Sequence, residues 1–162
     1  MTELGLLRRA VDFGMRDSDD PRTRIGAAIQ LSVDPWDVCF GSNRFPQGVE
    51  ASEARKSPEH KARYIEHAER DVLLTCAKYG FKTKGAVMYA PWFACCHCAR
   101  AIIGAGVKEV VGLRKLRHLT PARWSDEIAA AHQMLEEAGV EMWWVAADLG
   151  TKILFDGKEI EV

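Results

Sequence analysis

Residues 85–114, GAVMYAPWFACCHCARAIIGAGVKEVVGLR, decide how this chain folds. The apolar run 85–90 is typical of a buried strand, and the run 108–114 predicts a second one. Between them, residues 98–106 predict a helix that ends in glycine. A strand, a helix and another strand in this order are typical of a βαβ unit with parallel strands and a right-handed crossover.

The segments on either side of this unit continue the alternation of helices and strands. Residues 66–80 predict a helix that Gly80 closes. Residues 120–139 predict a long helix with Thr120 as its cap and Pro121 at its first position, and residues 140–146 predict a last central strand. The tail, residues 151–162, is expected either to add an edge strand or to lie across the surface.

The first part of the chain adds an amphipathic helix, a hairpin and a loop. Residues 2–17 carry apolar side chains at helical spacing. The short apolar runs 25–31 and 37–43 predict a hairpin, which makes the sheet mixed. Residues 44–64 show no consistent period, and a loop of that length in a compact domain is usually functional or mobile. The pattern predicts an α/β fold in layers.

Composition places the chain among ordinary globular proteins. A length of 162 residues, 48% apolar and 28% charged, fits a single domain, 1–162. The net charge of −1 gives no indication of a nucleic-acid or membrane partner, and no run resembles a signal peptide or a membrane span. We therefore expect a cytoplasmic protein. Five cysteines, an odd number, are expected to be reduced, so a close pair is interpreted as metal-binding or catalytic.

The cysteine-rich run has the spacing of half a zinc site. At the start of a helix, Cys95 and Cys98 are three positions apart and lie on one face. Cys96 lies about a hundred degrees round the helix and His97 about twice as far, so the outer pair is selected. The helix N-terminus favours the thiolate form, which binds metal, and Cys-x-x-Cys supplies two ligands of a tetrahedral zinc site.

The third ligand is expected at the other helix start, in IEHAERD, residues 65–71. With His67 at the cap, its ring and the Glu69 carboxylate can face the same pocket. Three protein ligands leave one zinc position for water, which is typical of a catalytic site. Glu69 is then expected to act as a proton shuttle beside that water and not as a ligand.

Other interpretations of these residues stay open. Cys-x-x-Cys after a strand is also typical of a thioredoxin-like redox site. That fold would need a later strand that begins with proline, whereas the only later proline, Pro121, is expected to start a helix. A structural zinc site in an interaction domain would need a fourth ligand, and the sequence has no second Cys-x-x-Cys. Three other cysteines are interpreted as packing residues: Cys39, Cys76 and Cys96. Three histidines are interpreted as surface groups: His60, His118 and His132. Trp143 and Trp144 are interpreted as core or interface residues.

His-Ala-Glu, followed some thirty residues later by Cys-x-x-Cys, resembles the zinc-dependent cytidine and deoxycytidylate deaminase superfamily. DPRTRIGAAI (20–29), GSNRFPQGVE (41–50) and CHCARAIIGAGVKEVV (96–111) resemble further segments of it, closest to the deoxycytidylate (dCMP) deaminase branch. The resemblance implies a three-layer α-β-α cytidine-deaminase-like fold with a central mixed sheet, a Zn²⁺ cofactor and homo-oligomers. One position departs from the family, which usually has proline where this chain has Ala94.

The resemblance also implies an activity and a set of substrate contacts. The expected reaction is hydrolytic deamination of a cytosine nucleotide, dCMP to dUMP and ammonia; the alternatives are free cytidine or deoxycytidine, guanine, or a non-enzymatic zinc domain. Asn43 is expected to bond the sugar hydroxyl, and the backbone near Ala68 and Ala90 to hold the base edge. For a 5′-phosphate the candidates are Arg24, Arg44 and the basic cluster Arg55, Lys56, Lys61 and Arg63, which could equally pair with nearby glutamates.

Overall fold

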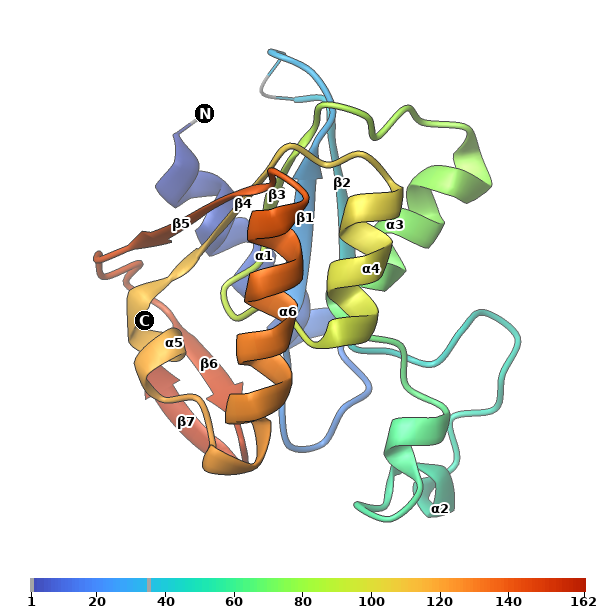
Figure 1. Ribbon diagram of the computed structural model, residues 1–162. Coiled ribbons are helices and arrows are strands. Elements are labelled where there is room, and N and C mark those ends of the chain that lie inside the picture. The colour runs from blue at the N-terminus through green and yellow to red at the C-terminus, as the bar shows by residue number, and fades with distance from the viewer. Residues whose placement is uncertain (1, 35) are drawn as a thin grey trace.

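A computed structural model of the protein describes residues 2–34 and 36–162, so Pro35 in the turn of the predicted hairpin lies outside the described residues. Its centre is a five-stranded mixed sheet of order β2-β1-β3-β4-β5 (Figure 1). β1 pairs antiparallel with both β2 and β3, whereas β3, β4 and β5 are parallel. The strands are β1 (Gly26–Gln30), β2 (Val38–Ser42), β3 (Val87–Tyr89), β4 (Glu109–Leu113) and β5 (Glu141–Val145).

Helices cover both faces of this sheet (Figure 1). The long ones are α1 (Glu3–Asp17), α3 (Ala68–Tyr79), α4 (Cys96–Gly104) and α6 (Ser125–Glu137). Short helical turns are α2 (Glu53–Lys56) and α5 (Arg114–His118), together with the 3₁₀ turns η1 (Lys61–Arg63) and η2 (Ala122–Trp124). α1 lies on one face, and α3, α4 and α6 lie on the other, which is the three-layer α-β-α arrangement that the sequence predicted.

Glycines let α1 and α3 approach the strands closely from opposite sides. A Cβ on Gly26 of β1 would lie 2.0 Å from the carbonyl oxygen of Ala10 in α1. A Cβ on Gly41 of β2 would lie 2.4 Å from the backbone nitrogen of Val72 in α3. Because Gly41 pairs with the residue next to Gly26, the two glycines face opposite sides of the sheet. The contact at Gly41 sets the distance between the sheet and α3, whose N-cap is His67.

The tail forms a separate hairpin of β6 (Lys152–Phe155) and β7 (Lys158–Glu161) and adds no strand to the main sheet. It docks on residues 22–24 before β1. The backbone N–H of Arg24 donates to the Leu154 oxygen at 2.8 Å, and the N–H of Gly157 donates to the Arg22 oxygen at 2.7 Å. Ile153 and Phe155 of this hairpin are buried.

Three predictions of local structure were wrong. β5 is an edge strand and not a central one, and Trp143 on it is 57% exposed. The long helix begins at Ser125 and not at Pro121, because a separate 3₁₀ turn, η2, with Pro121 as its N-cap, lies before it. His132 is not a surface group: its ring packs between Phe93 and Trp144, and its Nε2 lies 3.1 Å from the Phe93 carbonyl oxygen.

The other minor predictions agree with the structure. Cys76 is fully buried, and Cys39 and Cys96 pack against the core. His60 and His118 are exposed. The 44–64 segment carries α2 and η1 and runs to the pocket described below. Among the described residues, no helix combines the length and the apolar character that crossing a membrane requires.

Candidate active site

Two helix N-termini meet at one point and bring three metal-binding side chains together. His67 is the N-cap of α3, Cys95 is the N-cap of α4, and Cys98 lies in the first turn of α4. The Nδ1 of His67 lies 3.5 Å from the Sγ of Cys95 and 3.6 Å from that of Cys98. The two sulfurs are 3.5 Å apart. These three are the only group of this kind that the described part of the chain contains.

The triangle fits zinc. For tetrahedral coordination, the usual bond lengths place two sulfurs about 3.8 Å apart and a sulfur about 3.6 Å from a nitrogen. The observed separations are within a few tenths of an ångström of these values. One imidazole and two thiolates are also a donor set that zinc favours. His67, Cys95 and Cys98 can therefore hold Zn²⁺ with one coordination position left over.

A hydrogen bond between the two cysteine sulfurs stabilises the thiolate form of one of them. The sulfurs of Cys95 and Cys98 share a hydrogen bond, and this bond, together with His67, lowers the pKa of Cys95 to about 3, although burial opposes the shift. The same bond raises the pKa of Cys98 above its ordinary value. The pair thus shares one proton, which a bound cation would displace.

Glu69 lies in the first turn of α3 and faces the same pocket as His67 and Cys95. Its side chain is almost completely buried, at 4% exposure. Burial raises the pKa of the Glu69 carboxyl above its ordinary value, although the charge of His67 opposes this. A carboxyl group with a raised pKa holds its proton more readily than an ordinary carboxyl group, which suits the predicted shuttle.

Arg70 is a residue that the sequence reasoning missed. Its Nη1 lies 3.8 Å from the Sγ of Cys98 and 4.0 Å from that of Cys95. Glu66, one helical turn earlier, accepts a hydrogen bond from the Nε of Arg70 at 2.5 Å. The sequence shows the i, i+4 spacing of Glu66 and Arg70, but it does not show that the Arg70 guanidinium points to the cysteine sulfurs.

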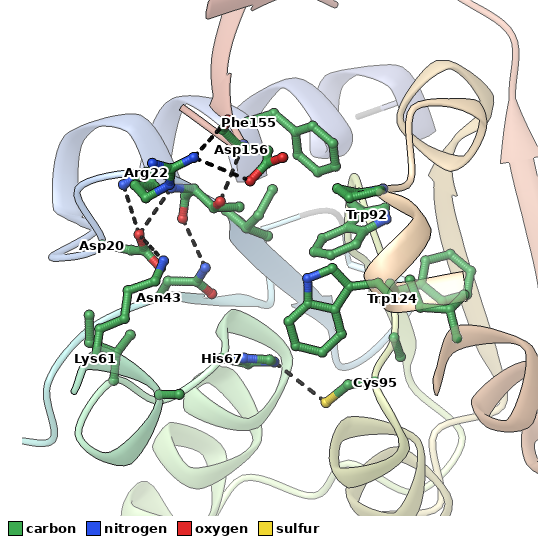
Figure 2. A pocket seen from close by; sticks show the side chains of 18 of the residues that line it. Asp20, Arg22, Asn43, Lys61, His67, Trp92, Cys95, Trp124, Phe155 and Asp156 are labelled. Atoms are coloured by element: carbon green, nitrogen blue, oxygen red, sulfur yellow. Dashed lines mark hydrogen bonds and ion pairs between the residues drawn. The ribbon is translucent and has the colours of Figure 1, made fainter. Parts of the chain in front are cut away.

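The cluster opens into a cavity of about 310 Å³ (Figure 2). Trp92, Trp124 and Phe155 form an aromatic wall: the ring of Trp92 is 6.2 Å from Trp124 and 5.0 Å from Phe155, edge to face in both cases. Trp124 also lies edge-on to His67, 6.4 Å away. Phe93 and Ala94, the residue in the place of the family's usual proline, complete this side.

Asn43 lines the pocket and connects its walls. Its Nδ2 donates to the Thr23 oxygen at 2.9 Å, and its Oδ1 accepts from the N–H of Ala68 at 3.0 Å. One Nδ2 proton remains for a ligand. Ala68 and Ala90 are buried and do not line the cavity, and the N–H of Ala90 donates to the Val111 oxygen.

The predicted phosphate candidates are mostly placed elsewhere. Neither Arg24 nor Arg44 lines the pocket; Arg24 donates to the Met15 oxygen at 3.1 Å, and Arg44 pairs with Asp71 at 2.8 Å. Arg55 and Lys56 pair with Glu50 and Glu53, and Arg63 is exposed. Of the basic cluster only Lys61 reaches the pocket, together with Arg22 and Arg123, which the sequence reasoning did not consider.

Comparison with known proteins agrees with this geometry. The family described as the cytidine and deoxycytidylate deaminase zinc-binding region matches residues 2–113. The chain therefore belongs to this zinc-binding deaminase family, and zinc is its cofactor. Within the family its similarity extends to the deoxycytidylate deaminases. The human deoxycytidylate deaminase is 34% identical over 129 residues, which are 76% of this chain and 68% of the human protein.

Two further similarities support the family and the fold. A deaminase of Aliivibrio fischeri, encoded in the luxG 3′ region, is 29% identical over 134 residues, which cover 82% of this chain and 86% of that protein. The dCMP deaminase of cyanophage S-TIM5, solved in complex with dCMP and dUMP, superposes with a TM-score of 0.65 at 23% identity. That match covers 87% of this chain and 94% of the phage chain and confirms the predicted cytidine-deaminase-like fold.

Proposed function

We propose that the protein deaminates dCMP by hydrolysis and gives dUMP and ammonia. The observation that carries this proposal is the buried carboxyl of Glu69, which faces one 310 Å³ pocket together with the ligands His67 and Cys95. The similarity to human deoxycytidylate deaminase and to a phage enzyme solved with dCMP and dUMP supports the choice of substrate.

Each step of this reaction requires a particular group in the pocket. Bound zinc would lower the pKa of a water molecule toward neutrality. Glu69 would take a proton from a water molecule in the pocket and pass it to N3 of the cytosine ring, which makes C4 electrophilic. After the hydroxyl adds to C4, Glu69 would move the proton of that hydroxyl to the 4-amino group, and ammonia leaves as the C4 carbonyl forms. One water is consumed, and the ring becomes uracil.

The pocket also suits the rest of the substrate. The aromatic wall formed by Trp92, Trp124 and Phe155 can pack against a planar base. The free Nδ2 proton of Asn43 supports the predicted bond to a sugar hydroxyl. The backbone near Ala68 and Ala90 stays a prediction for the base edge. Since both N–H groups are already paired inside the protein, such a contact would use a carbonyl oxygen, which suits an amino group as donor.

We also propose that residues 1–162 form a single domain and that the protein assembles as a homo-oligomer. We propose further that it acts in the cytoplasm on a free nucleotide and not on a nucleic acid. One core that runs from Leu6 to Val162 supports the single domain. Five cysteines without a disulfide suit a reducing compartment. The exposed Trp143 on an edge strand supports self-association, which light scattering on the purified protein would measure.

The decisive experiment is an ammonia-release screen with zinc-loaded protein over dCMP, deoxycytidine, cytidine, CMP, guanine and adenosine. We expect the highest kcat/KM on dCMP, loss of activity with a chelator and recovery with zinc. Activity confined to guanine or to free nucleosides would replace dCMP by one of the alternative substrates. A folded, zinc-loaded protein inactive on all six would favour the structural-zinc interpretation.

A further inference from the structure

The pocket has two chemically different ends (Figure 2). His67 and Cys95 lie at one end, Arg22 and Asp156 lie at the other, and Asn43 lies between them. A nucleotide carries a base, a sugar and a phosphate in the same order. If the base is at the metal-binding end and the sugar near Asn43, the phosphate reaches the end with Arg22.

That end holds a cluster of two guanidinium groups around one carboxylate. The Nη2 of Arg123 lies 2.5 Å from the Oδ1 of Asp156, and its Nη1 lies 3.2 Å from the Oδ2. The Nη2 of Arg22 lies 3.7 Å from the same Oδ1. The cluster carries a net charge of +1, which attracts an anion. It also contains the forked donors that bind phosphate oxygens well.

The third cation of the pocket is engaged more firmly. The Nζ of Lys61 donates to both carboxylate oxygens of Asp20, at 2.8 and 2.7 Å. Asp20 is only 6% exposed and also accepts hydrogen bonds from the N–H groups of Arg22 and Thr23. Releasing Lys61 would therefore leave a buried carboxylate without its cation, which is costly.

The pairs with Asp156 are easier to exchange. The side chains of Arg22 and Arg123 are 51% and 60% exposed, and exposed ion pairs contribute little to stability. A phosphate ester close to a dianion offers the two guanidinium groups more charge than one carboxylate does. The backbone holds Asp156 beside them, because its N–H donates to the Thr23 hydroxyl and the N–H of Gly157 donates to the Arg22 oxygen.

We propose that Arg22 and Arg123 bind the 5′-phosphate of the substrate, and that Asp156 competes with this phosphate for the two guanidinium groups. The inference rests on the proposed function and assigns its phosphate contacts. It also gives the C-terminal hairpin a role in specificity. This hairpin lies outside residues 2–113, which the family match covers. Asp156 then determines how strongly the pocket favours a phosphorylated substrate over a free nucleoside.

The test compares Arg22→Gln, Arg123→Gln and Asp156→Asn with the wild type on dCMP and deoxycytidine. Each arginine variant should raise KM for dCMP about tenfold and leave deoxycytidine unchanged. Asp156→Asn should lower KM for dCMP several-fold, since it removes the competing charge; asparagine tolerates the positive φ of 50° at this position. These effects should shrink at high salt, because the groups are exposed.

Two controls make the comparison specific. Arg16 is an exposed arginine that also pairs with a carboxylate, Asp17, but lies outside the pocket, so Arg16→Gln should behave as wild type on both substrates. Calorimetric titration with dUMP and deoxyuridine measures binding without turnover. The arginine variants should weaken dUMP binding about tenfold and leave deoxyuridine binding unchanged. Thermal unfolding of each variant checks that the fold is intact.

The outcomes separate this inference from the proposed function. A wild type that is equally efficient on dCMP and deoxycytidine would overturn the nucleotide substrate and the phosphate contacts together. A wild type that prefers dCMP, with both arginine variants keeping that preference, would overturn the contacts alone. If Asp156→Asn raises KM for dCMP, Asp156 orients the guanidinium groups and does not compete with the phosphate.

Discussion

The guanidinium group of Arg70 lies against the sulfur of Cys98, with its Nη1 3.8 Å from the Sγ. It also reaches the sulfur of Cys95, and Glu66 holds it in this position. When both cysteines ionise to bind metal, their thiolates and the carboxyl of Glu69 concentrate negative charge around one point. A cation fixed beside both sulfurs offsets that charge and stabilises the form of the cysteines that binds metal.

Arg70→Gln is therefore expected to weaken zinc binding by roughly tenfold or more, the range found for partners of metal ligands. Competition with a coloured chelator at neutral pH measures the affinity directly. Arg100→Gln is the matched control, because Arg100 lies on α4 but pairs with the exposed ring of His97. Equal zinc affinity in the wild type and in the Arg70 variant would remove the role assigned to this guanidinium.

Glu69→Gln keeps the shape of the side chain and removes its ability to move protons. Zinc content should stay near one per chain, while turnover of dCMP should fall by roughly a hundredfold or more, as expected for lost acid–base catalysis. Metal analysis and steady-state kinetics on the same sample give both values. Full deaminase activity in this variant would end the proposed mechanism.

The alanine substitutions of the three cysteines are expected to differ in their effect on zinc binding and activity. Cys95→Ala and Cys98→Ala should lose zinc and activity, since each removes a ligand. Cys96→Ala should keep both, because the Cys96 thiol donates to the Glu127 oxygen and points to α6. Zinc content by atomic absorption decides between them. A Cys96 variant without metal, beside a Cys95 variant with metal, would show that the ligands are assigned wrongly.

His132 is expected to make stability depend on pH. Burial lowers its pKa below the ordinary value, the bond to the Phe93 oxygen opposes this, and the charge of Arg117 adds to the lowering. The unfolded chain then takes up the proton first as the pH falls below about 6.5, so the free energy of unfolding decreases there.

A His132→Gln variant can still donate to Phe93 but does not titrate. Urea unfolding of both proteins between pH 8 and pH 5, with zinc in excess, should show a smaller decrease for the variant. Other titrating groups, including the metal ligands, are the same in the two proteins, so the difference isolates His132. Parallel pH dependences would contradict the prediction.

The metal-binding end of the site could be predicted because it depends on local rules. His67, Cys95 and Cys98 lie at helix starts that caps, glycine and spacing mark in the sequence. The opposite end of the pocket could not. Phe155 and Asp156 follow Cys95 by some sixty positions, and a short amphipathic tail carries no signal for the surface on which it docks.

The edge position of β5 and the position of Arg24 outside the pocket both depend on features that the sequence pattern did not report. The apolar run of β5 would suit a central or an edge strand equally, since periodicity does not report neighbours. Closeness in sequence suggested Arg24 as a phosphate ligand, but Asp20 binds the N–H groups of residues 22 and 23 and turns the chain there. As a result Arg22 lines the pocket, while Arg24 reaches back to α1.

The contact at Gly41 has a consequence for how the sequence can vary. Every other amino acid brings a Cβ, and here it would overlap the backbone of α3 at Val72. A larger residue must push away α3, whose N-cap is the metal ligand His67, even though position 41 is not itself a ligand. In a saturation-mutagenesis library, position 41 should therefore tolerate change as poorly as the ligands do, whereas exposed positions on β5 should accept most substitutions.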